Sequence, residues 1–156
     1  MNVKIVAIGK IKEQYLKEAI KEYEKRLTSF CTFSIVELAA EQILDEAMCE
    51  KYKELEADRI LQQIKSDSFI ITLEIKGKMF SSEEFASKMK DIANTGVNDI
   101  TFIIGGANGL HQKVSDTSNL KLSFSKMTFT HQMIRMILTE QIYRAFKINN
   151  NEKYHR

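Results

Sequence analysis

The sequence predicts an α/β domain with a mainly parallel β-sheet flanked by helices. Short runs rich in β-branched residues alternate along the chain with longer stretches of helical periodicity. The connections between these runs are long enough for right-handed crossovers between parallel strands. Two runs, 68–75 and 99–104, are almost continuously apolar, as is typical of parallel strands buried on both faces. By length, residues 1–156 are expected to form one domain.

The N-terminal part of the chain predicts two strand–helix units. Asn2 to Ile8 is a short β-rich run that we interpret as a buried strand. Glu13 to Leu27 has apolar residues at spacings of three and four, which predicts an amphipathic helix. Thr32 to Leu38 alternates as a second strand. Ile43 to Ile64 predicts a long helix whose apolar stripe consists of Leu55, Ile60, Leu61 and Ile64.

A third strand and helix are predicted in the middle of the chain. Ser68 to Ile75 is strongly apolar and indicates a central strand, which we expect Gly77 to end. Ser81 and Glu84 match a capping box, in which the hydroxyl accepts from the third helical N–H and the carboxylate reaches back. The sequence therefore predicts a helix that continues to about Ala93.

The last part of the chain predicts two strands and a closing helix. Asp99 to Ile104 and Leu120 to Phe124 are the expected strands, and Thr130 to Phe146 is the helix, with Thr128 or Thr130 as its cap. An unusually wide arc of this helix is apolar: Met133, Ile134, Met136, Ile137, Leu138, Ile142, Ala145 and Phe146. Such an arc packs on its own sheet and on a second surface, for which another subunit is the simple candidate.

Composition and charge limit the possible functions. No apolar run approaches the roughly 18–20 residues of a membrane span, and the N-terminus has no signal-peptide pattern, so we expect a cytoplasmic protein. Cys31 and Cys49 are expected to be free thiols, and no Cys–His spacing predicts a metal site. The net charge is +2, but residues 121–156 alone carry +5. This excess favours an anionic partner, or it belongs to a solvated helix face and tail.

The first candidate site is the glycine-rich run from Gly105 to Gly109, directly after a buried strand. Glycine allows the backbone to come close to a ligand, and ligands of open parallel sheets bind beyond the carboxyl ends of the strands. The run matches neither the dinucleotide fingerprint nor a phosphate loop. A plain strand-to-helix turn is therefore the alternative.

A second loop, Phe124 to Phe129, follows the last predicted strand. Its aromatic rings and methionine can flank a nucleobase or a sulfonium group, and its hydroxyls can bind a base edge. An apolar turn that packs on the core is the alternative. No acidic residue lies in these two loops.

The charged residues of the closing helix leave two interpretations open. Glu140 and Arg144 are four residues apart and can pair with each other. Alternatively, Arg144, Arg135 and Lys147 can contact phosphates.

The three histidines differ in their sequence context. We expect His111, after the glycine run, at the surface, and His131 in a structural hydrogen bond at the start of the closing helix. His155 lies in the terminal Tyr154-His155-Arg156. An aromatic ring, an imidazole and a guanidinium in a row can stack on and bind a nucleobase.

Taken together, these motifs resemble a known family. The runs IIGGANGLH, LSFSKMTFTHQMIRMILTEQIYRAFKI and the terminal YHR are similar to those of the bacterial 23S ribosomal RNA pseudouridine N3-methyltransferases, small members of the SPOUT class. The similarity extends to KIVAIGKIKEQYLKEAIKEYEKRL and to ITLEIKGKMFSSEEFA, so it covers nearly the whole chain.

The resemblance implies a SPOUT-type fold whose C-terminal part is tied in a deep trefoil knot. It implies S-adenosylmethionine as cofactor, no metal, and a homodimer in which each site is completed by the partner subunit. The implied substrate is a pseudouridine in helix 69 of 23S rRNA within the assembled ribosome. By matching motifs, the cofactor contacts fall on Leu73, Gly105, Phe124, Ser125, Lys126, Met127, Thr128 and Phe129.

Four residues depart from the family pattern. Thr130 stands where the family usually has Pro, and Thr can cap the helix instead. Asn150, Asn151 and Lys153 stand where Arg, Gly and Pro are common, so they bear on the path of the tail.

Methyl transfer to N3 of pseudouridine requires an aligned nucleophile that loses its proton. We expect His155 to be the base, Tyr154 to position the nucleobase, and Arg144 or Arg156 to stabilise the negative charge. The alternative function is that of a non-catalytic nucleotide-binding module that associates with the ribosome.

Overall fold

In the computed structural model, which describes residues 1–154, five parallel strands form one sheet in the order β2-β1-β4-β3-β5. The strands are β1 (Asn2–Ile8), β2 (Thr32–Leu38), β3 (Phe69–Met79), β4 (Asp99–Ile104) and β5 (Leu120–Ser123). The predicted α/β class with its parallel sheet is thus confirmed. The strands alternate with helices because each parallel neighbour is reached by a crossover.

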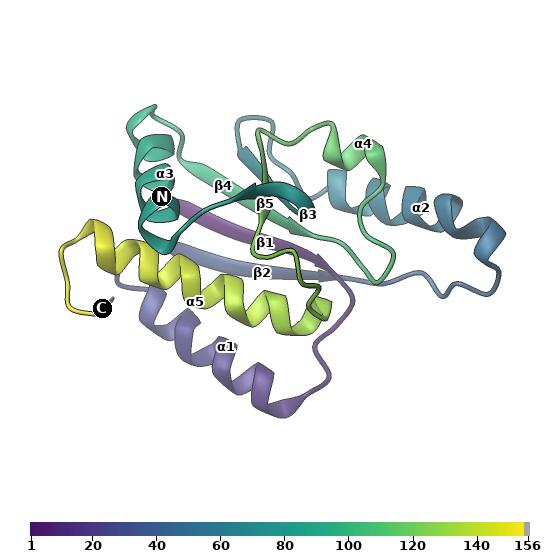
Figure 1. Ribbon diagram of the computed structural model, residues 1–156, viewed down its shortest axis with the longest axis horizontal. Helices are drawn as coiled ribbons and strands as arrows, with labels where there is room; N and C mark the ends of the chain where they lie inside the picture. The colour runs from purple at the N-terminus through teal and green to yellow at the C-terminus, as the bar shows by residue number, and fades with distance from the viewer. Residues whose placement is uncertain (155–156) are drawn as a thin grey trace.

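Helices cover both faces of this sheet (Figure 1). One face carries α1 (Gln14–Leu27), α3 (Ser82–Asn94) and α5 (His131–Asn149). The other carries α2 (Cys49–Leu61), which a short 3-10 turn, η1 (Glu46–Met48), precedes, and α4 (Gln112–Ser115). Among residues 1–154, no helix combines the length and apolar character needed to cross a lipid bilayer.

The central strands are buried on both sides, as their apolar sequences predict. Along β1, Ile5 and Ala7 pack in the core beneath α1, α3 and α5, whereas Val6 and Ile8 pack in the core beneath α2 and α4. This alternation follows from the two-residue period of a strand. All four side chains are fully buried.

Strand β3 is longer than expected, because Gly77 lies inside it rather than at its end. The pairing of β3 with β5 shifts register between Leu73 and Lys78. A Cβ atom on Gly77 would lie 2.7 Å from the backbone of Lys121 and Leu122. Gly77 therefore allows the two strands to come close at an irregularity, and the prediction that it ends the strand is wrong.

Helix α2 is shorter than the predicted range 43–64. The polar start of that range forms η1, and the helix proper ends at Leu61. Leu55 does not belong to the apolar stripe, because its side chain is 41% exposed. The buried residues of α2 are Ala57 and Ile60. Charged residues between the apolar ones obscure the helical periodicity of residues 43–64, and the predicted helix is therefore too long.

Helix α5 begins as predicted and extends three residues beyond Phe146. The Thr130 hydroxyl caps it by accepting from the N–H of Met133 at 3.2 Å. The helix lies between α1 and α3 and contacts both (Figure 1). These neighbours supply the second surface that its wide apolar arc requires, so the arc by itself does not indicate another subunit.

Candidate active site

A cleft of about 740 Å³ opens at the carboxyl ends of β4 and β5, beside the middle of β3. Its walls come from residues 73–75 of β3, the end of β4 and the glycine run after it, the segment 122–130 and the first turn of α5. Ligands of open parallel sheets bind at this edge, and the volume is in the usual range of small-molecule sites. The sheet topology therefore creates a candidate ligand site.

Seven of the eight residues that the sequence assigns to a cofactor line this one cleft: Leu73, Gly105, Phe124, Ser125, Met127, Thr128 and Phe129. Lys126 is not among the lining residues. The loop is ordered by local bonds, since the Ser125 hydroxyl accepts from the N–H of Met127 at 3.0 Å. Met127 is 76% exposed and Phe129 44% exposed. Apolar side chains are thus open to a ligand or a partner, while their contact with a cofactor stays a prediction.

The glycine run forms a tight turn rather than a phosphate loop. The Gly109 N–H donates to the Gly106 carbonyl at 3.0 Å. A Cβ atom on Gly105 would lie 2.8 Å from the Gly109 carbonyl carbon, so the close return of the chain requires glycine there. The turn presents backbone rather than side chains to the cleft.

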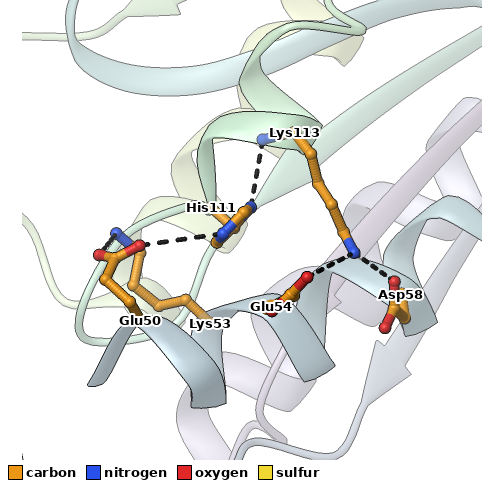
Figure 2. Close-up of polar contacts among 6 residues, drawn as sticks. All are labelled: Glu50, Lys53, Glu54, Asp58, His111 and Lys113. Atoms are coloured by element: carbon orange, nitrogen blue, oxygen red, sulfur yellow. Dashed lines mark hydrogen bonds and ion pairs between the residues drawn. The ribbon is translucent and has the colours of Figure 1, made fainter. Parts of the chain in front are cut away.

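The turn is followed by the short helix α4, which the sequence did not predict (Figure 2). His111 Nδ1 caps it by accepting from the N–H of Lys113 at 3.2 Å. The Lys113 ammonium donates to Asp58 and lies 3.8 Å from Glu54, and His111 Nε2 lies 3.9 Å from Glu50. These contacts connect α4 to α2 and so help to fix the glycine turn.

The prediction for His111 was incomplete, because this residue caps α4 as well as facing α2. One feature of the sequence could have indicated this contact. Glu50, Glu54 and Asp58 are four residues apart, which places three carboxylates on one face of α2, where they can bind a basic segment. Which segment those carboxylates meet depends on the tertiary fold.

His131 lines the cleft at the start of α5. Burial lowers the pKa of its imidazole, and Arg135 and Lys12 lower it further. The neutral form is therefore favoured more than in an exposed histidine. The sequence predicted only a structural role for this residue.

Arg135 is buried and paired within the chain, so the interpretation that it meets phosphates is wrong. Its side chain is fully buried. It donates to Glu37 Oε1 at 2.7 Å and to the Gly9 carbonyl at 3.1 Å. Burial lowers the pKa of this guanidinium, and Glu37 opposes the shift. Arg135 therefore joins α5 to the ends of β1 and β2.

Arg144, in the C-terminal half of α5, contacts Tyr154, which lies in the segment after the helix. Arg144 Nε donates to Glu140 Oε1 at 2.9 Å, which confirms the predicted pair, and the Tyr154 hydroxyl donates to the same oxygen at 3.0 Å. The Tyr154 ring lies 4.8 Å from the Arg144 guanidinium and packs edge-on against Tyr143. Burial raises the pKa of the Tyr154 phenol. The ring and the guanidinium are thus held as a unit.

The terminal segment that leads to this unit turns at Asn151. Its φ of 55° is left-handed, a conformation that glycine and asparagine adopt more easily than other residues. Asn151 can therefore take the place of the family's glycine. His155 and Arg156 lie outside the described residues.

The cleft and the Arg144–Tyr154 unit do not form one site within a chain. The cleft contacts α5 at positions 130–134, and the unit contacts it at 140–144. At a rise of 1.5 Å per residue, Ile134 and Arg144 are about 15 Å apart along the helix axis. The structure therefore separates the predicted cofactor residues from Arg144 and Tyr154 within one chain.

The cleft also contains a carboxylate that the sequence analysis missed. Glu74 directly follows Leu73, outside the two loops, and lines the cleft. No group of three or more potential metal ligands occurs in residues 1–154. With apolar walls, exposed backbone groups and one carboxylate, the lining suits a nucleoside-type cofactor that carries a positive charge.

Three comparisons relate the chain to known proteins. The family model described as "Predicted SPOUT methyltransferase" matches residues 1–155. A Latilactobacillus sakei protein named ribosomal RNA large subunit methyltransferase H is 48% identical over 159 residues, covering 100% of both chains. A Methanococcus maripaludis protein, provisionally given the same name, is 52% identical with the same full coverage. A solved structure, described as a probable methylase family protein from Haemophilus influenzae Rd KW20, has a TM-score of 0.56. It is 15% identical, covers 99% of this chain and 70% of that one, and shows the fold alone.

Proposed function

Because the chain belongs to the SPOUT methyltransferase family, we propose that it methylates N3 of a pseudouridine in 23S rRNA with S-adenosylmethionine as donor. The observation that carries this proposal is the cleft, in which seven residues of the family's cofactor motifs meet. Two relatives of full length and about half identity bear the name of a large-subunit rRNA methyltransferase. A protein this similar over its whole length supports the same reaction class.

The residues of the cleft suit the proposed cofactor. Phe124, Met127 and Phe129 offer apolar surface for an adenine ring and a sulfonium, and the Gly105 turn offers backbone groups. When bound, S-adenosylmethionine supplies an electrophilic methyl group on a positively charged sulfur. The residues around it orient that group and exclude water, which carries much of the rate in an in-line displacement.

We infer that two copies of the chain build each complete site. The roughly 15 Å along α5 between the cleft and Arg144 supports this, since one chain alone keeps its two functional groups apart. Ile75, Met127 and Phe129 are exposed apolar residues that line the cleft. They suit a surface that a second copy covers. The homodimer thus brings the Arg144–Tyr154 unit of one copy to the cleft of the other.

In this site the protein must remove a proton from N3 of the pseudouridine. His155 is the proposed base, and Tyr154 positions the nucleobase. The Arg144 guanidinium, which Glu140 and the Tyr154 ring hold in place, stabilises the negative charge that develops on the base. Glu140 and Tyr23 in turn fix the Tyr154 hydroxyl.

The proposed substrate is helix 69 in the assembled ribosome, in the cytoplasm. Residues 121–156 carry a charge of +5, which favours RNA. We infer that residues 1–156 act as a single domain, with a deep trefoil knot that holds the segment 124–130. Such a small protein offers little RNA surface, so recognition depends on the dimer and on ribosome shape. Free rRNA fragments are therefore expected to be poor substrates.

Two measurements test the proposal. Titration calorimetry with S-adenosylmethionine should show binding to the purified protein. Ribosomes from a strain that lacks the gene should gain one N3-methylpseudouridine, detected by nucleoside mass spectrometry, when the protein and the donor are added. A protein that binds ribosomes but neither binds the donor nor methylates them is instead the non-catalytic module.

A further inference from the structure

We propose that Glu74 recognises the positive charge of the sulfonium and so makes the cleft prefer the methyl donor over the demethylated product. This inference rests on the proposed function and adds to it a residue that determines specificity. It follows from where the carboxylate lies, how it is held, and which charges surround it.

Glu74 is placed in the cleft by the geometry of β3. Thr72 and Glu74 are two residues apart on a strand, so their side chains project from the same face, toward α4. The hydroxyl of the buried Ser115, in α4, donates to the Glu74 carboxylate. Leu73 projects from the opposite face and lines the cleft beside the segment 122–129. Glu74 thus lines the cleft from the middle of β3, next to Leu73.

The carboxylate is held in one orientation and keeps an oxygen available. The Thr72 hydroxyl donates to Glu74 Oε1 at 2.7 Å. The Ser115 hydroxyl lies 2.9 Å from Oε1 and 3.1 Å from Oε2, and its single proton serves one of them at a time. Because each carboxylate oxygen can accept more than one hydrogen bond, the Glu74 carboxylate retains acceptor capacity for a ligand. A carboxylate fixed in this way need not reorganise when a cation binds.

Glu74 is the single acidic residue among those that line the cleft, and Lys126 and Arg135 are not among them. Among residues 1–154, His131 is the one basic side chain in the lining, and burial favours its neutral form. In a cleft with apolar walls, the attraction between a carboxylate and a ligand cation is stronger than in bulk water. Glu74 therefore gives the cleft a negative charge where the proposed donor carries a positive one.

The reaction itself removes the charge that Glu74 would recognise. The methyl–sulfur bond breaks, its electron pair remains on sulfur, and a new bond joins the methyl carbon to N3. The sulfonium becomes a neutral thioether, and the positive charge is cancelled by the anionic base. Glu74 then loses its attraction for the sulfur centre, which favours release of S-adenosylhomocysteine.

Binding of three ligands to the full-length protein tests the proposal. S-adenosylmethionine and sinefungin carry a cation at the sulfur position, and S-adenosylhomocysteine does not. Glu74→Gln keeps the shape and removes the charge. Measured by calorimetry, Glu74→Gln should lower the affinity for S-adenosylmethionine and sinefungin about tenfold. It should lower the affinity for S-adenosylhomocysteine less than about threefold. Ser115→Ala, which removes one orienting donor, should show the same pattern with a smaller loss.

Any other pattern of affinities would contradict the inference, and each pattern points to a different role of Glu74. An equal loss for all three ligands would mean that Glu74 binds the ribose or the amino group, and no loss would mean that it only joins β3 to α4. Either result overturns the inference while the proposed function stands. Failure of the wild-type protein to bind any of the three overturns the proposed function itself. Glu18→Gln, the same chemical change outside the cleft, is the matched control, and thermal unfolding confirms that each variant folds.

Discussion

The two ends of α5 differ in how completely their side chains are partnered. At the N-terminal end, the helix meets a cleft whose apolar residues Met127 and Phe129 are largely open. At the C-terminal end, the hydroxyl of Tyr154 and the guanidinium of Arg144 share the carboxylate of Glu140. The open end suits a ligand that comes and goes, whereas the partnered end suits a group presented in a fixed position. In the proposed function, one helix therefore carries two groups of functional residues at a fixed separation.

The largest expected effect on stability is at the open end, beneath the cleft. Arg135→Met should lower the free energy of unfolding by about 3 kcal/mol, because it leaves Glu37 and the Gly9 carbonyl without their buried partner. Urea denaturation measures this. Arg144→Met at the other end is the matched control, and as a partly exposed pair it should cost at most about 1 kcal/mol. Equal losses would show that the two ends are alike in stability.

Arg144→Met, which should cost little stability, should instead have a large effect on activity. Arg144→Met is expected to slow methylation of ribosomes about 100-fold, since the charge on the reacting base loses its stabilising group. The affinity for S-adenosylmethionine should remain unchanged, because Arg144 does not line the cleft of its own chain and is proposed to meet the nucleobase in the partner's site. Single-turnover kinetics and calorimetry measure the two quantities. A variant with weak cofactor binding would contradict the separation of the two ends.

A smaller effect is expected from the turn that closes the cleft. Gly105→Ala places a methyl group 2.8 Å from the Gly109 backbone, so the turn must shift. We expect cofactor affinity to fall about tenfold. Gly96→Ala is the control, because its Cβ would meet open space while its φ of 86° imposes strain far from the cleft. If both variants lose affinity equally, general destabilisation is the cause.

The smallest expected effect is a pH dependence at the open end. The pKa of His131 in the folded protein is below its usual value of 6.5, so the unfolded chain takes up the proton first on acidification. Stability should therefore fall as the pH drops through about 6.5 and stop falling once the folded pKa is passed. His131→Asn should flatten this part of the profile, measured by urea denaturation between pH 5 and 8, a range chosen around the histidine pKa. An unchanged profile would remove His131 as its source.

The local pattern was enough to predict much of the sheet. The bounds of β1, β2 and β4 match the predicted runs. Strands β1 and β4 are mostly buried and largely apolar, whereas the edge strand β2 alternates between partly buried and exposed residues, and both patterns can be recognised in sequence. Gly77 was misjudged because its role, the close approach to β5, is a contact with residues more than forty positions away. The four residues of α4 are too few to show helical periodicity.

The loops that line the cleft could be predicted from the sequence, but the partners of its charged residues could not. The loop residues form continuous motifs, which can be recognised without knowledge of the fold. Arg135 was misinterpreted because its partner Glu37 is 98 positions away, and a buried arginine looks like an exposed one in sequence. Glu74 was missed because only the fold brings Ser115 and the cleft to it.

The distance along α5 between the cleft and the Arg144–Tyr154 unit has a consequence for mixtures of defective chains. If each site takes its cleft from one copy and its tail from the other, the two kinds of defect are complementary. Gly105→Ala and Arg144→Met chains, each poorly active alone, should form mixed dimers in which one of the two sites has no altered residue. Co-expression of the two should restore methylation to cells that neither variant rescues.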